Sequence, residues 1–84
     1  MTSSSEIFER IKPIIAEHLE IIDESIIKED SLILEDLGAD SLEIMELVIL
    51  CEEEFGIEIP NEEVDNVESV TDVIALIGSR LEQS

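Results

Sequence analysis

Apolar residues recur at helical spacing in three stretches of this chain, which predicts three main helices. The first stretch begins after Ser3, which has capping-box spacing to Glu6. We expect the helix to reach residue 22 along one apolar stripe, formed by Ile7, Phe8, Ile11, Ile14, Ile15, Leu19 and Ile22. Pro13 interrupts this pattern, because proline cannot donate a helical hydrogen bond. We therefore expect a kink between Glu9 and Pro13, or a helix that restarts there.

A second helix is predicted from about Ser41 to Phe55, and its apolar residues lie on two faces. One face, suited to a core, contains Ile44, Val48, Cys51 and Phe55. The second is a stripe beside several carboxylates, and it comprises Leu42, Met45 and Ile49, with Glu43, Glu46 and Glu53 as its acidic neighbours. Two interpretations of Met45 and Ile49 follow: a helix buried nearly all round, or a docking surface. We adopt the docking surface.

The remaining segments complete an all-α fold over residues 1–84, which we expect to form a single domain. The connection 23–39 is polar, with apolar residues that should pin it to the core: Ile26, Ile27, Leu32, Ile33, Leu34 and Leu37. After an extended pair, Ile57 and Ile59, we expect a short helix from Asn61 to about Val67. The last helix should begin at Ser69 or Thr71 and contribute Val70, Val73, Ile74, Ile77 and Leu81 to the core. The result is a three-helix bundle with an additional short helix.

Charge narrows the range of partners. The chain has 23 acidic and 4 basic residues and a formal net charge of -19. We therefore expect neither nucleic acids nor anionic membranes as partners, since phosphate recognition draws on Lys and Arg. A basic protein surface is the expected partner. Apolar residues make up 44% of the chain, enough for a packed core. The sequence has no signal peptide and no run that could cross a bilayer, so we expect a cytoplasmic protein without membrane insertion.

Neither metal binding nor catalysis is indicated by the residues. Cys51 and His18 are the only cysteine and histidine, so the chain has no zinc-ligand set and no internal disulfide. Cys51 has apolar helical neighbours and is expected in the core. His18 is expected at a solvated edge of the first helix. No nucleophile is paired with a base in the sequence, which argues against an enzyme.

Ser41 is the candidate site of a covalent modification. The chain reads Gly-Ala-Asp-Ser-Leu over residues 38–42. If Asp40 is the N-cap, Glu43 occupies the third helical position and the two approximate a capping box. Ser41 then has no capping role. Its hydroxyl lies at the positive end of the helix dipole, where an ester phosphate is favoured.

The stretch from Glu35 to Pro60, Glu-Asp-Leu-Gly-Ala-Asp-Ser-Leu-Glu-Ile-Met-Glu-Leu-Val-Ile-Leu-Cys-Glu-Glu-Glu-Phe-Gly-Ile-Glu-Ile-Pro, resembles the signature of acyl carrier proteins. The resemblance is to the free-standing type of dissociated fatty acid synthesis, and it covers the whole chain. It implies the family's four-helix fold and a 4'-phosphopantetheine arm on Ser41, flanked by Asp40 and Leu42. The thiol of the arm would carry the acyl chain as a thioester.

The resemblance also implies partners and a shelter for the acyl chain. The partners would be a phosphopantetheinyl transferase and basic patches of fatty acid synthesis enzymes and acyltransferases. The carrier itself would be a monomer. The second stripe of the Ser41–Phe55 helix and its carboxylates predict the docking residues, which are Glu43, Met45, Glu46, Ile49 and Glu53. By alignment with the family, the space that shelters the acyl chain would be lined by Leu42, Val48, Cys51, Ile59, Val64, Val67 and Ile77.

Three other classes of protein could share some of these features. A specialised carrier of a polyketide, peptide or other acyl-transfer pathway would have the same signature. A calcium sensor fails on spacing, because the loop from Asp36 lacks the glycine required at its sixth position. An acidic inhibitor that mimics nucleic acid would need the charge but not the Gly-Ala-Asp-Ser-Leu turn.

Overall fold

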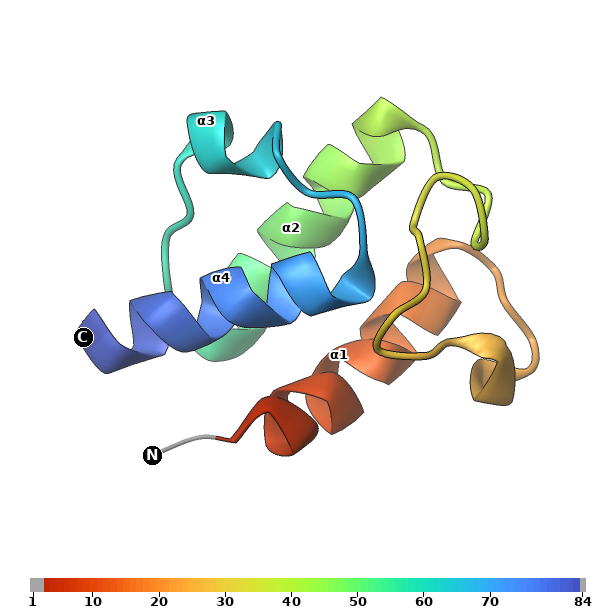
Figure 1. The fold of residues 1–84 in the computed structure, drawn as a ribbon, viewed down its shortest axis with the longest axis horizontal. Coiled ribbons are helices and arrows are strands. Elements are labelled where there is room, and N and C mark those ends of the chain that lie inside the picture. The colour runs from red at the N-terminus through yellow and green to blue at the C-terminus, as the bar shows by residue number, and fades with distance from the viewer. Residues whose placement is uncertain (1–2, 84) are drawn as a thin grey trace.

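The computed structural model describes residues 3–83 and consists of helices joined by loops (Figure 1). The α-helices are α1 (Ser4–His18), α2 (Ser41–Phe55), α3 (Asn61–Val64) and α4 (Val70–Gln83), with a short 3-10 helix, η1 (Glu24–Ile26), in the long connection. Helices α1, α2 and α4 pack on one another, and α3 packs on α2. Over the described residues the only β-pairing is an isolated bridge between Leu32 and Ser69. The predicted bundle with an additional short helix is confirmed.

The core consists almost entirely of aliphatic side chains, most of them from the three long helices and the rest from α3 and the connecting segments. Its most completely buried residues are Ile7, Ile11 and Ile15 of α1, Ile33 of the connection before α2, Leu47, Val48 and Cys51 of α2, and Val70, Val73 and Ile77 of α4. Leu47 was absent from the predicted core face of α2. The aromatic rings of Phe8 and Phe55 lie partly buried at the edge of this cluster.

Helix α1 ends earlier than the apolar stripe predicts. Its last residue is His18, and Ile22 is fully exposed at 100%, so the extension to residue 22 is wrong. Glu20 takes a left-handed conformation with φ +57°. The N–H of Ile21 donates to the carbonyl of Ala16 at 2.8 Å, and that of Glu20 to Glu17 at 3.3 Å. This is a Schellman cap, in which glycine is the usual left-handed residue.

Pro13 does not divide α1. The helix is continuous from Ser4 to His18, so the predicted alternative of a restart is wrong. Pro13 lies on the exposed side of the helix, while Ile7, Ile11 and Ile15 remain buried on the other. The carbonyl that loses its partner is that of Glu9, an exposed residue, so the loss falls where water can replace it.

The connection between α1 and α2 is tied to the beginning of α4. The N–H of Ile33 donates to the carbonyl of Glu68 at 2.9 Å, and that of Val70 to Ser31 at 3.0 Å. Ile27, Ile33 and Ala39 are buried, whereas Ile26 and Leu34 are exposed and do not pin the connection as predicted. The connection, orange to yellow in Figure 1, therefore lies at one end of the bundle, where it is held beside the beginning of α4 before it reaches α2.

The last two helices begin and end close to their predicted bounds. Helix α3 stops at Val64 rather than Val67, but both valines are buried. Helix α4 begins at Val70, where Ser69 and Asp72 cap each other. The Ser69 hydroxyl accepts the N–H of Asp72 at 3.3 Å, and the Asp72 carboxylate accepts the N–H groups of Glu68 at 2.9 Å and Ser69 at 3.0 Å. These bonds join α4 to the segment that pairs with the connection.

Asp72→Ala should destabilise the protein in a pH-dependent way. The N–H groups of Glu68 and Ser69 lower the pKa of Asp72. A lowered folded-state pKa means that the contribution is present above the ordinary Asp value of about 3.9 and is lost as pH falls through the folded pKa. Urea unfolding at pH 7 should show a loss of about 1 kcal/mol. The difference in the free energy of unfolding between wild type and variant should be smaller at about pH 3 than at pH 7. An equal difference at both pH values would contradict this prediction.

Glu20→Gly should stabilise the protein, because Glu20 bears the cost of a left-handed backbone that glycine adopts freely. We expect a gain of about 1 kcal/mol in the free energy of unfolding. Glu17→Gly is the matched control, since it removes the same side chain inside α1, where glycine costs about 1 kcal/mol relative to alanine. Opposite signs for the two variants in denaturant titrations are the expected result, and a loss of stability in both would refute the account of this cap.

Candidate functional site

Ser41 is the first residue of α2, and its neighbours cap the helix in its place. The Asp40 carboxylate accepts the N–H of Glu43 at 2.8 Å, and the Glu43 carboxylate accepts the N–H of Asp40 at 3.1 Å. The predicted capping box is therefore confirmed. The Ser41 side chain is exposed and makes no hydrogen bond to another described residue. Its hydroxyl is chemically available.

The loop before α2 turns sharply to deliver Ser41. Gly38 has φ +74°, and a Cβ added there would meet nothing within 4 Å, so glycine is needed for the backbone conformation alone. The next residue, Ala39, is buried, and its N–H donates to the carbonyl of Ile33 at 3.1 Å. Ala39 thus anchors the turn to the core on one side of Asp40 while Ser41 remains at the surface.

The backbone at the beginning of α2 is suited to a phosphate. The N–H of Glu43 is taken by the Asp40 carboxylate, and that of Ile44 by the Asp40 carbonyl at 3.0 Å. Within residues 3–83, the N–H groups of Ser41 and Leu42 have no acceptor. Two free donors at the positive end of a helix dipole beside an exposed hydroxyl fit an ester phosphate on Ser41.

The second apolar stripe of α2 is open to solvent. Leu42 is 64% exposed, Ile49 53% and Met45 45%. The interpretation in which α2 is buried nearly all round is therefore wrong for these residues. Ile44, Val48 and Cys51 are buried as predicted, and Phe55 is partly buried against them. Glu46 and Glu53 are exposed beside the stripe, and Glu43 is half-buried because it takes part in the cap.

His18 joins the end of α1 to the first turns of α2, so its predicted place at a solvated edge is wrong. Its side chain is 18% exposed. Its Nε2 lies 3.2 Å from the carbonyl oxygen of Glu43 and 3.5 Å from Oε1 of Glu46. A carbonyl only accepts, so the hydrogen bond requires the proton on Nε2. Nothing in the local sequence of α1 indicates this contact, which spans 25 residues of chain.

The residues aligned with the family's acyl shelter lie largely within the core. Val48, Cys51, Ile59, Val64, Val67 and Ile77 are all buried, whereas Leu42 is exposed beside Ser41. Burial raises the pKa of the Cys51 thiol to about 12, with smaller contributions from the charges of Glu54 and Glu52. Cys51 is thus a packed core residue, as predicted, and remains protonated at neutral pH.

Residues 3–83 offer neither a metal site nor a membrane span. No group of three or more His, Cys, Asp and Glu side chains is arranged to hold a metal ion there. None of the described helices combines the length and apolarity that a membrane span requires. Ser41, at the capped beginning of α2, instead offers an exposed hydroxyl that can be modified covalently.

Comparison with known proteins defines the class. The family model described as "Phosphopantetheine attachment site" matches residues 9–77. Curated proteins named acyl carrier protein are similar to most of the chain. The one from Clostridium acetobutylicum is 49% identical over 92% of this chain and 99% of its own length. Those from Campylobacter hominis and Thermosynechococcus vestitus are 46% and 43% identical, over 86% and 94% of this chain and 90% and 96% of their own lengths. The chain belongs to the acyl carrier protein family.

Proposed function

We propose that this chain carries acyl intermediates of fatty acid synthesis on a 4'-phosphopantetheine arm esterified to Ser41. The observation that supports this assignment is the free hydroxyl of Ser41 at the beginning of α2, where Asp40 and Glu43 supply the cap. The ester phosphate would lie beside the free N–H groups of Ser41 and Leu42. When attached, the group supplies a terminal thiol on which an acyl chain is held as a thioester.

The protein's own residues position the site and perform no bond chemistry. Asp40 fixes the first turn of α2 and thereby the direction of the Ser41 side chain. Leu42, exposed beside Ser41, offers an apolar contact next to the attachment point. Cys51 is buried and protonated, and His18 bonds to α2, so neither is available as a nucleophile or base for Ser41. This arrangement supports the proposal of a carrier that serves as the substrate of other enzymes.

Partner enzymes would dock on the exposed stripe of α2. Met45 and Ile49 supply apolar contact area, and the carboxylates of Glu43, Glu46 and Glu53 supply the charge. Basic patches of a phosphopantetheinyl transferase, of synthase enzymes and of acyltransferases complement this surface. We further propose a monomeric, cytoplasmic carrier in which residues 1–84 form one functional unit.

Ser41→Ala should abolish loading and leave the fold intact, since alanine is at least as good a helix former and the cap does not involve the Ser41 hydroxyl. Intact mass after incubation with coenzyme A and a phosphopantetheinyl transferase should show the added arm in the wild type and none in the variant. Ser79→Ala, which removes an exposed serine from α4, is the matched control and should load fully. A loaded Ser41→Ala protein would place the arm elsewhere.

The double replacement Glu46→Lys and Glu53→Lys should slow association with the transferase by about tenfold or more at low salt, because steering by complementary fields is lost. Glu43 is left unchanged, since it caps α2. The control carries the same charge change on exposed residues elsewhere, as Glu35→Lys and Glu62→Lys. Stopped-flow association rates over a salt series measure the effect. Equal slowing in both pairs would mean that net charge, and not this surface, governs docking.

A further inference from the structure

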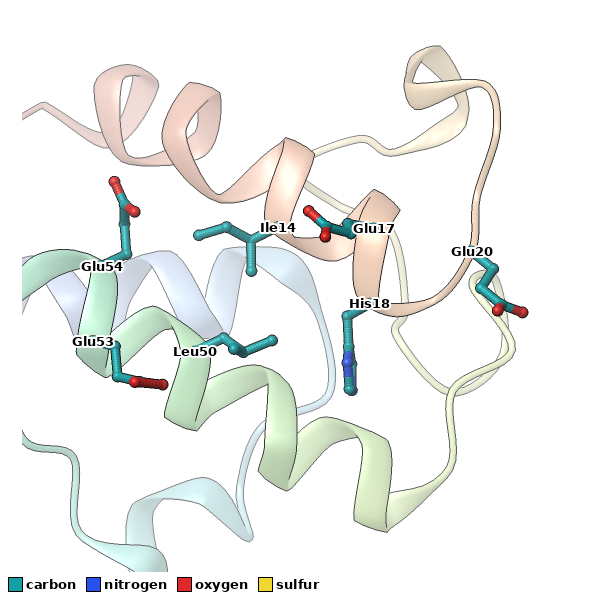
Figure 2. Close-up of a pocket in the computed structure, with 7 residues that line it drawn as sticks. All are labelled: Ile14, Glu17, His18, Glu20, Leu50, Glu53 and Glu54. Atoms are coloured by element: carbon teal, nitrogen blue, oxygen red, sulfur yellow. The ribbon is translucent and has the colours of Figure 1, made fainter.

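The groove between α1 and α2 has an apolar floor. It encloses about 580 Å³, and Figure 2 shows Ile14 of α1 and Leu50 of α2 pointing toward each other across it. Leu50 is 38% exposed, and Ile14 is half-buried where it packs on the core. This floor is distinct from the stripe of Leu42, Met45 and Ile49, and the proposed carrier function does not use it. A partly exposed apolar pair of this kind can accept one apolar side chain.

Carboxylates form the rim of the groove. Glu17 and Glu20 lie on the α1 side, and Glu53 and Glu54 on the α2 side. Glu54 is paired with Arg10 at 2.8 Å, whereas Glu17, Glu20 and Glu53 have no ion-pair partner within the described residues. The rim is therefore strongly negative.

The chain has few cations with which to neutralise this rim. Lys12 pairs with Glu9 on α1, and Arg80 pairs with Glu63 on α3, both away from the groove. His18 also lines the groove (Figure 2), but its Nε2 lies against the Glu43 carbonyl oxygen and the Glu46 carboxylate rather than against the rim. Nor do the rim carboxylates form a metal site, because no suitable cluster exists among the described residues. Charge complementarity thus favours Arg and Lys side chains of another protein, on either side of the apolar floor.

We propose that the groove between α1 and α2 binds a basic segment of a partner protein, in which Arg or Lys side chains flank a single apolar side chain. The apolar side chain would contact Ile14 and Leu50, and the cations would pair with Glu17 and Glu20, which are not part of the docking stripe. Consecutive residues of an α-helix point about 100° apart. Leu50 therefore faces the groove while Ile49 faces the docking stripe.

This arrangement allows two partners to bind at once. A protein held in the groove leaves the stripe and Ser41 uncovered, so the carrier could remain tethered while other enzymes use its arm. That consequence rests on the proposed function, whereas binding in the groove does not. The groove can accordingly be tested on the unloaded chain.

The test uses the full chain, labelled with ¹⁵N, and a short synthetic peptide in which arginines flank one leucine. Backbone shifts on titration should centre on Ile14, Glu17 and Leu50. Leu50→Ala should weaken binding roughly three- to tenfold, while Ile49→Ala, its neighbour on the same helix, should change it by less than about twofold. Glu17→Gln should weaken binding about two- to fivefold, and Glu62→Gln, an exposed residue of α3 outside the groove, should have little effect.

Three results would overturn the proposal. Equal effects of Glu17→Gln and Glu62→Gln would reduce the interaction to general charge attraction. Shifts centred on Met45 and Ile49, with Leu50→Ala silent, would assign the peptide to the docking stripe. Undiminished binding of a peptide with serine in place of its leucine would show that apolar contact with Ile14 and Leu50 does not contribute to binding. The Leu50→Ala protein should still accept the arm from coenzyme A; loading failure in the wild type would count against the Ser41 assignment alone.

Discussion

The packing of a small aliphatic core holds together a chain of net charge -19. Every other feature of the structure depends on this packing. From residue 29 to residue 79 the sequence has no Lys or Arg, so the carboxylates on this part of the surface repel one another without local compensation. Ion pairs such as Arg10–Glu54 are exposed and contribute at most about 1 kcal/mol each. Burial of Ile, Leu and Val from three helices is therefore the largest source of stability, and it must exceed the repulsion as well as the conformational entropy.

Helix α2 serves this core and the exposed site at the same time. Ile44, Leu47, Val48 and Cys51 are buried, and the opposite face is left to solvent. A helix with only one apolar face could not do both. The capping box leaves the Ser41 hydroxyl without a capping role. The side chains of Asp40 and Glu43 each accept the other residue's backbone N–H group. The His18 contact then fixes these first turns relative to α1.

Structural features that depend on residues close together in the sequence were the ones predicted correctly. The capping box follows from the four residues Asp40 to Glu43, and helix α2 follows from the apolar spacing that continues to Phe55, so the position of Ser41 at a helix start could be predicted without a structure. The end of α1 could not, because Glu20 occupies a left-handed position that glycine usually marks. The place of His18 and the exposure of Leu34 depend on elements distant in sequence. The groove escaped prediction for the same reason, since its floor joins one residue from each of two helices.

The burial of Cys51 has a consequence for chemical selectivity. Thioesters transfer their acyl group to any accessible thiolate, so a reactive cysteine close to the arm would divert cargo onto the protein itself. Because burial raises the pKa of the Cys51 thiol to about 12, the thiol stays protonated at neutral pH. Its side chain is also completely buried between α2 and the rest of the bundle. The Cys51 thiol is therefore kept out of thioester exchange, and the thiol of the arm proposed for Ser41 would be the one thiol available to hold an acyl group.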